Sequence, residues 1–309
     1  MKILIVANNK PGRFSPFVLE QVDALKRLGV DFNFFGVDGK GASGYLSSLP
    51  ALKKKIHEYH PDLVHAHYGL SGLLANLQRS VPVITTYHGS DVHSLGLNLS
   101  ISKIVSRFSA YNIFVSKDLL ELTCCKQGKQ SVIPCGVDTT TFYPIERTDA
   151  RKQLRWDTSG KYVLFAGAFD NEVKNSQLAM AAVSLVPEAK LMELRGYTRE
   201  QVNLVMNAAN CLLMTSYREG SPVVTKEAMA CGTPIVSVDV GDVKEVTTGV
   251  DGCFITTYDE IDIAAKIKTA LSFQGKTEGP QKISEKGLSN DILVKQIFDI
   301  YKKVIELSK

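Results

Sequence analysis

Short apolar runs alternate with longer amphipathic stretches along the whole chain. Apolar residues at helical spacing predict helices between these runs, as at 16–28, where Gly29 ends the pattern. Strands that alternate with helices are typical of a parallel sheet covered by helices on both faces. The apolar runs predict strands at 2–7, 31–36, 62–65, 82–87, 111–115, 131–133, 161–166, 189–194, 211–215, 234–238 and 252–255.

The alternation is interrupted once, at residues 134–150 (PCGVDTTTFYPIERTDA), and then restarts. We therefore predict an α/β protein with two tandem Rossmann-like, doubly wound domains, 1–147 and 148–289. A last helix, within 290–309, could pack back on the first domain. The 309 residues, 44% of them apolar, are enough for two cores and exclude a disordered or fibrous chain. In such folds ligands bind beyond the carboxyl ends of the strands, here in a cleft between facing domains.

The distribution of charge favours an anionic partner for the first domain. Residues 1–147 hold 16 Lys and Arg against 11 Asp and Glu, whereas residues 148–309 hold 20 against 21. No apolar run approaches the roughly 18–20 residues of a membrane span, and the N-terminus lacks the features of a signal peptide. The six cysteines show no C-x-x-C spacing. Together these features predict a cytoplasmic protein with reduced thiols.

The most informative segment is 211–247, in which a strand leads through a loop into a helix. Ser221 and Pro222 are predicted as the N-cap and first residue of this helix, and Gly232 ends it. The free N–H groups at its N-terminus would form an anion site suited to phosphate. Glu219 before the helix and Glu227 inside it would instead accept hydrogen bonds from sugar hydroxyls.

Other candidates follow strands directly. His88 could hydrogen-bond a ligand or act as an acid or base. His65 and His67 end another strand, but H-x-H without a spaced carboxylate or thiolate is a weak metal signal, so we expect no metal site. Lys174, in the loop after the first strand of the second domain, could bind a diphosphate as a point charge.

The first loop, 8–15 (NNKPGRFS), lacks both the G-x-G-x-x-G fingerprint and the P-loop motif. NAD binding and P-loop chemistry are therefore disfavoured. Its single glycine, Gly12, would still permit a close approach of the backbone to a ligand.

The segment EGSPVVTKEAMACGTPIV resembles the E-x7-E signature of the group 1 glycosyltransferases, the retaining family-four enzymes with the GT-B fold. The resemblance extends over nearly the whole chain. Further stretches that look like this family follow in the family's order: PDLVHAHYG, TYHGSDV, FVSKDL, IPCGVDTTTFYP and VDVGDVKEV.

The resemblance implies roles for individual residues. Glu219 matches the residue that binds the donor sugar's hydroxyls and Glu227 the one that binds the nucleotide ribose. Lys174 matches the base that holds the diphosphate, and His88 matches the histidine that contacts the donor sugar from the first domain. The loop whose backbone faces the donor corresponds to Gly220, Ser221, Pro222 and Val223.

On the acceptor side, Gly12 matches the family's N-terminal glycine loop near the phosphate and the acceptor. The cations Arg13 and Lys53–Lys55 could attract a lipid-linked diphosphate sugar or an anionic membrane face.

Two departures from the family pattern stand out. Ala168 occupies the position of a usual arginine, so one cationic phosphate clamp is missing; Arg195 and Arg218 are substitutes by position only. The segment 186–200 is short, which implies a trimmed sheet in the second domain.

The resemblance implies a retaining glycosyltransferase, of the hexosyltransferase type, that acts without a metal or other cofactor. It would move a sugar from a nucleotide diphosphate sugar to a glycan or lipid-linked acceptor, as in polysaccharide biosynthesis. Peripheral association with the inner face of the membrane is implied as an option, and nucleic acid is not an expected partner. The alternatives are another GT-B enzyme, such as a nucleotide-sugar 2-epimerase or a phosphorylase, and a non-catalytic nucleotide-sugar-binding protein.

Overall fold

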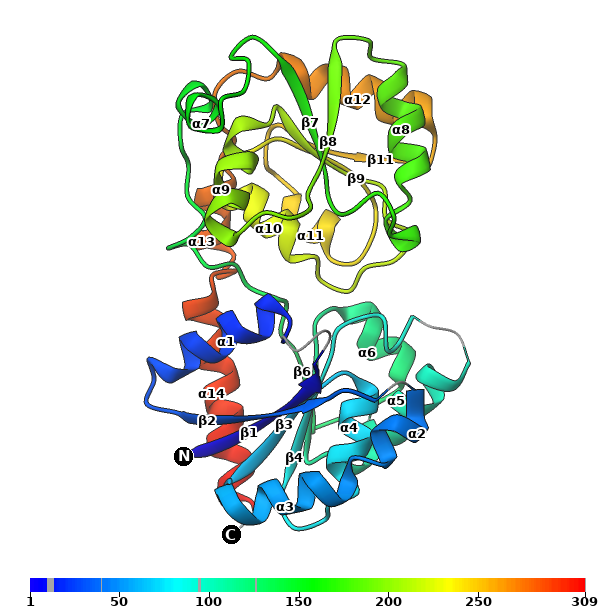
Figure 1. Cartoon of the computed structure of the whole chain (residues 1–309), viewed down its shortest axis with the longest axis vertical. Helices are drawn as coiled ribbons and strands as arrows, with labels where there is room; N and C mark the ends of the chain where they lie inside the picture. The colour runs from blue at the N-terminus through cyan, green and yellow to red at the C-terminus, as the bar shows by residue number, and fades with distance from the viewer. Residues whose placement is uncertain (10–13, 40, 94–95, 126, 309) are drawn as a thin grey trace. The chain divides into compact units, whose positions relative to one another are not determined.

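The computed structural model describes residues 1–9, 14–39, 41–93, 96–125 and 127–308. Contacts between residues divide the chain into two compact units (Figure 1). Unit 1 comprises Met1–Cys135 and Asn290–Lys309, and unit 2 comprises Gly136–Ser289.

Unit 1 is built on a parallel sheet of six strands in its described part, in the order β2-β1-β3-β4-β5-β6. Alternate residues of a strand point to opposite faces, so β1 supplies Ile3 and Ile5 to one core and Leu4 and Val6 to another. The strands are β1 (Lys2–Asn8), β2 (Asp31–Val37), β3 (Leu63–His67), β4 (Val83–Tyr87), β5 (Tyr111–Phe114) and β6 (Gln130–Val132).

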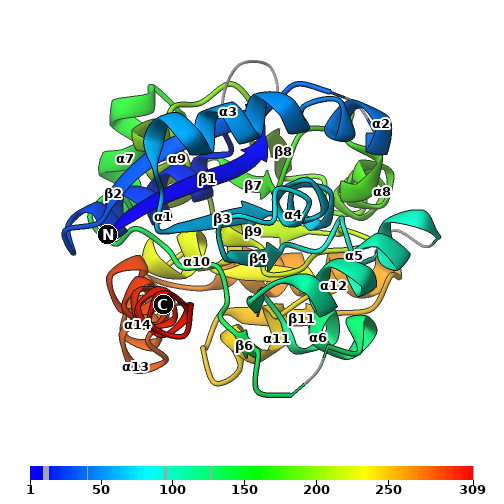
Figure 2. The ribbon, with the colours of Figure 1, turned by 90° about the horizontal axis from the view of Figure 1, so that it is seen from below.

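Helices cover both faces of this sheet. The face of Ile3 and Ile5 packs against α1 and α14, and the opposite face packs against the helices that follow β2 and β3. Helices α4 and α5 lie side by side (Figure 2). The helices of unit 1 are α1 (Pro16–Lys26), α2 (Gly41–Leu46), α3 (Leu49–Tyr59), α4 (Gly69–Asn76), α5 (Leu97–Phe108), α6 (Lys117–Thr123) and α14 (Asn290–Glu306).

The polypeptide passes between the units at two places. The structure divides the chain after Cys135 rather than at residue 147, because Val137 and Phe142 are buried in the core of unit 2. The last helix, α14, belongs to unit 1, where it packs against α1 and buries Tyr301 completely.

Unit 2 has a parallel sheet of five strands in the order β11-β10-β9-β7-β8. One face packs against α8 and α12, and the other packs against α9, α10 and α13. The strands are β7 (Lys161–Phe165), β8 (Ala189–Glu193), β9 (Cys211–Met214), β10 (Ile235–Val238) and β11 (Cys253–Thr256). The helical segments are α7 (Arg147–Leu154), η1 (Glu172–Lys174), α8 (Ser176–Ser184), α9 (Arg199–Ala208), α10 (Val223–Ala230), α11 (Val243–Thr247), α12 (Glu260–Ser272) and α13 (Gly279–Glu285).

The predicted fold class is confirmed: both units are parallel α/β sheets with helices on both faces, and each predicted strand is present. A short helix also forms in a glycine-rich stretch that has no helical apolar pattern: α2 begins at Gly41 and buries Tyr45. Across the described residues, no helix combines the length and the apolar character that a bilayer-spanning segment needs.

Candidate functional site

The carboxyl ends of three neighbouring strands of unit 2 gather several of the predicted residues. Strands β7, β9 and β10 are adjacent in the sheet. Lys174 follows β7, Glu219 follows β9 and Asp242 follows β10. Because parallel strands bring their carboxyl ends to one edge, three loops distant in sequence converge there.

A lysine and a carboxylate meet at this edge. The Nζ atom of Lys174 donates to Oε1 of Glu219 at 2.6 Å, with side-chain exposures of 20% and 16%. The backbone N–H of Tyr217 donates to the carbonyl of Val173 at 2.9 Å, which ties the two loops together. Gly167 leaves room for the lysine, because a Cβ there would lie 2.9 Å from Cγ of Lys174. The site thus presents a positioned cation beside a hydrogen-bond acceptor.

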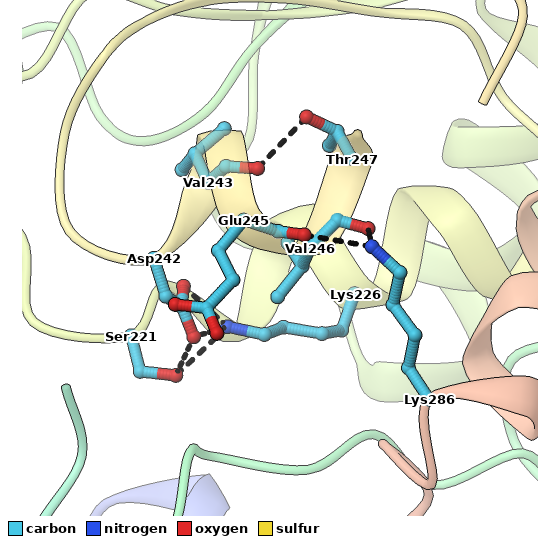
Figure 3. Close-up of polar contacts among 8 residues, drawn as sticks. All are labelled: Ser221, Lys226, Asp242, Val243, Glu245, Val246, Thr247 and Lys286. Atoms are coloured by element: carbon cyan, nitrogen blue, oxygen red, sulfur yellow. Dashed lines mark hydrogen bonds and ion pairs between the residues drawn. The ribbon is translucent and has the colours of Figure 1, made fainter. Parts of the chain in front are cut away.

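A buried polar cluster that sequence reasoning missed joins the loop after β9, helix α10 and the loop after β10 (Figure 3). Lys226 is completely buried, and its Nζ atom donates to both carboxylate oxygens of Asp242, at 2.7 and 2.6 Å. It also donates to Oγ of Ser221 at 2.8 Å, and that hydroxyl donates to Asp242 at 2.6 Å. The ammonium, the carboxylate and the hydroxyl therefore satisfy one another inside the protein.

The cluster corrects the predicted start of the helix. Helix α10 begins at Val223 with Pro222 as its N-cap, so Ser221 is not the cap and Pro222 is not the first helical residue. The hydroxyl of Ser221 is engaged by Asp242 and Lys226 instead of by the helix N–H groups. Without a side-chain cap, the first N–H groups of α10 keep their capacity for an anion.

The loop after β10 contacts the loop that carries Glu219. Gly241 has a φ of +58°, and a Cβ at this position would lie 2.6 Å from the carbonyl oxygen of Gly220. Only glycine fits both the left-handed backbone and this close approach. Together with the Asp242 hydrogen bond to Ser221, this contact fixes the 219–221 loop.

Glu227 is 3% exposed and faces a partner from α9. Its Oε1 atom lies 2.6 Å from Nη2 of Arg199, whose guanidinium stacks over the ring of Phe142 with 4.6 Å to the centroid. Burial raises the pKa of Glu227, and the Arg199 charge opposes that rise. Arg199 was not predicted. The sequence signals only the start of its helix, through the capping box of Thr198 and Gln201.

The two arginines considered as substitutes at Ala168 lie on the surface. Arg195 is paired with Asp170 at 2.9 Å, and both side chains are more than half exposed. Arg218 is exposed in the loop next to Glu219. Lys174 forms its ion pair with Glu219.

His88 belongs to unit 1, where it follows β4 and joins a stack of imidazoles. Its Nε2 atom lies 2.9 Å from Nδ1 of His67, and the two rings stack 5.2 Å apart. His67 also stacks on His65, which hydrogen-bonds Tyr301 of α14 at 2.6 Å. Burial and the nearby His67 lower the pKa of His88 well below its ordinary value. His88 is thus suited to hydrogen bonding as a neutral imidazole.

The buried histidines of this stack predict a pH-dependent stability. Burial lowers the pKa of His67 to about 3 and that of His65 well below its ordinary value. His65, His67 and His88 are neutral when folded but take up protons below about pH 6.5 when unfolded, which costs about 2 kcal/mol each at pH 5. Asp91 opposes this by about 1 kcal/mol, because burial raises its pKa to about 6. We therefore expect the free energy of unfolding to fall by about 5 kcal/mol between pH 7 and pH 5.

Urea denaturation at the two pH values measures this effect. The variant His67→Asn should lose about 2 of these roughly 5 kcal/mol, whereas His57→Asn, on the exposed face of α3, should keep the whole pH dependence. A stability that is constant or rises toward pH 5 would contradict the assignment of neutral, buried imidazoles.

Unit 1 contains a cavity of about 580 Å³ at the carboxyl ends of β1, β3 and β4. Asp91 at its wall is held by the backbone N–H groups of His88, Gly89 and Gly69. The predicted acceptor-loop residues Gly12 and Arg13 lie outside the described residues. The cavity is lined by Asn8, Phe14, Ser15, Pro16, Tyr45, Tyr68, Leu70, Ser90, Asp91, Asn98 and Ser102.

Both units of the chain match known protein families. Residues 4–141 match the family model Glycosyltransferase Family 4, and residues 163–272 match Glycosyl transferases group 1. The two models cover most of both units, and the second contains Lys174, Glu219, Lys226 and Asp242. The chain belongs to the group 1 glycosyltransferases.

Two relatives with curated names are distant in sequence. TuaC of Bacillus subtilis, whose name describes a teichuronic acid biosynthesis glycosyltransferase, is 28% identical over 62% of this chain and 57% of that protein. A D-inositol 3-phosphate glycosyltransferase of Mycobacterium sp. (strain KMS) is 25% identical over 68% of this chain and 59% of that protein. The alignments thus span less than two thirds of the length of these relatives.

Solved structures share the fold of this chain. A sucrose-phosphate synthase from Thermosynechococcus elongatus has a TM-score of 0.84 at 18% identity and covers 99% of both chains. HepE of Anabaena, solved in complex with UDP, has a TM-score of 0.77 at 18% identity and covers 98% of this chain and 100% of that one. The chain therefore has the two tandem Rossmann-like domains of the GT-B fold.

Proposed function

We propose that this group 1 glycosyltransferase moves a sugar from a nucleoside diphosphate sugar to a glycan or lipid-linked acceptor, with retention at the anomeric carbon. The observation that carries the proposal is the Lys174–Glu219 pair at the carboxyl edge of the unit 2 sheet. The complexes of HepE with UDP and with UDP-glucose support a nucleotide-sugar donor.

The chemistry required matches these two side chains. Breaking the bond between the sugar and the phosphate places positive charge on the sugar and negative charge on the leaving diphosphate. An ammonium group has three donors, so Lys174 can keep its bond to Glu219 and still donate two to phosphate oxygens. The uncapped N-terminus of α10 adds partial positive charge. Glu219 keeps a second carboxylate oxygen for a sugar hydroxyl.

For retention, the acceptor hydroxyl attacks the anomeric carbon from the face that the diphosphate leaves. The hydroxyl proton passes to an oxygen of the leaving phosphate, so neither an enzyme nucleophile nor a metal is part of the proposed step. Glu227, paired with Arg199, keeps one carboxylate oxygen for the nucleotide ribose. His88 would donate or accept a hydrogen bond at the sugar as a neutral imidazole. We place this activity in the cytoplasm, at the inner face of the membrane.

A panel of nucleotide sugars tests the proposal. A matching donor should raise the melting temperature and, with an acceptor or with water, release nucleoside diphosphate at a rate that a metal chelator does not change. The anomeric configuration of the product, read by NMR, should equal that of the donor. Inversion, loss of turnover with the chelator, or conversion of the donor to an epimer without release of nucleotide would overturn it.

A further inference from the structure

Helix α5 of unit 1 carries a stripe of exposed apolar side chains. Leu97, Ile104 and Phe108 are 70%, 48% and 56% exposed, respectively. Their spacings of seven and four residues place them on one side of the helix. Single exposed apolar residues need no explanation, but three aligned along three turns form a patch that favours contact with an apolar partner.

Positive charge accompanies this stripe. Residues 97–108 (LNLSISKIVSRF) include Lys103 and Arg107 and no acidic residue. The guanidinium of Arg79 lies 5.1 Å from the ring centroid of Phe108. Unit 1 as a whole holds 19 Lys and Arg against 12 Asp and Glu. An apolar face flanked by cations is the pattern of helices that lie in the surface of an anionic bilayer.

We propose that the stripe of Leu97, Ile104 and Phe108 docks unit 1 onto the surface of an anionic lipid bilayer. A second copy of the chain fits less well, because a two-fold contact through the stripe would bring the cations Lys103 and Arg107 near their own counterparts. The lysines 53–55, considered from sequence, lie on α3, which contributes no large exposed apolar side chain.

Helix α5 connects the proposed docking surface with the cavity of unit 1. Asn98 and Ser102, on another side of the same helix, line the 580 Å³ cavity of unit 1. The walls of that cavity include the apolar and aromatic side chains of Phe14, Tyr68 and Leu70. If the proposed transfer reaction holds, docking through α5 would present a lipid-linked acceptor next to this cavity. The docking itself does not depend on the reaction and is tested separately.

The experiment uses the purified full chain and phosphatidylcholine vesicles with and without phosphatidylglycerol. The parent protein should float with the anionic vesicles. The variant Leu97→Ser/Ile104→Ser/Phe108→Ser should bind them at least about tenfold more weakly than the parent. Lys103→Gln/Arg107→Gln should weaken binding by about fivefold for each charge removed. The matched control, Ile261→Ser/Ile292→Ser/Leu307→Ser, removes three exposed apolar side chains elsewhere and should bind like the parent.

Circular dichroism and melting temperature establish that the variants are folded. Parent-like binding by the folded α5 variant would overturn the proposal, as would equal binding of the parent to neutral vesicles or no binding at all. A dimer that the α5 variant abolishes, without vesicle binding by the parent, would assign the stripe to a second copy instead. Release of nucleoside diphosphate from a nucleotide sugar in solution reports on the proposed transfer independently of these outcomes.

Discussion

Replacing Lys226 with methionine is expected to lower the free energy of unfolding by about 3–5 kcal/mol. The lysine is completely buried, and its removal leaves the 7%-exposed carboxylate of Asp242, among the described residues, with only the Ser221 hydroxyl as a polar side-chain partner. An uncompensated buried charge costs far more than the lost hydrogen bonds. Chemical denaturation followed by circular dichroism measures the change.

The same loop offers a matched control. Lys244 and Asp239 form an ion pair of 3.3 Å, but their side chains are 66% and 52% exposed. Lys244→Met should therefore change the free energy of unfolding by no more than about 0.5 kcal/mol. The double variant Lys226→Met/Asp242→Asn should recover much of the lost stability, because no buried charge remains. A single Lys226→Met variant as stable as the parent would show that the pair does not hold the loops.

This cluster also shows where prediction from sequence ends. The apolar periodicity predicts every strand and most helices, because parallel sheets are buried on both faces and leave a strong signal. Whether a charged residue in a helix is buried depends on a partner supplied by another loop. Lys226 looks like a solvated helix residue until Asp242, sixteen positions later, is placed beside it. The hydroxyl of Ser221, predicted from sequence as the N-cap of α10, is instead bonded to Asp242 and Lys226.

Helices α7 and α2 are hard to predict from sequence for a similar reason, because contacts with distant residues stabilise them. Helix α7 (RTDARKQL) has almost no apolar pattern, yet Arg151 is 3% exposed. Its guanidinium donates to the carbonyls of Ala208 and Thr158 and to the side-chain oxygen of Asn210, which anchors the helix through polar bonds. Helix α2 depends on the burial of Tyr45 in a glycine-rich stretch. Tertiary contacts of this kind override local propensity.

If the proposed transfer holds, Lys174→Met should lower turnover by about 10²–10³-fold while the folded state remains. The loss follows because the ammonium would stabilise the negative charge that develops on the leaving diphosphate. Stability should change little, since the Lys174–Glu219 pair is partly exposed and stands at the edge of the sheet. Initial rates of nucleoside diphosphate release measure the effect, together with the melting temperature of each variant.

Two further variants test whether the loss of turnover is specific to Lys174 or follows from removing any surface cation of unit 2. Lys152→Met removes a lysine that is 69% exposed on α7 and should leave turnover unchanged. Arg195→Met tests the surface arginine paired with Asp170. We expect only a small loss of turnover, because that pair is more than half exposed and shares no residue with the Lys174–Glu219 pair. If Lys174→Met kept turnover within about threefold of the parent, the leaving group would be stabilised elsewhere. The N-terminus of α10 and Arg218, which directly precedes Glu219, would then be the candidates for positive potential at this edge of the unit 2 sheet.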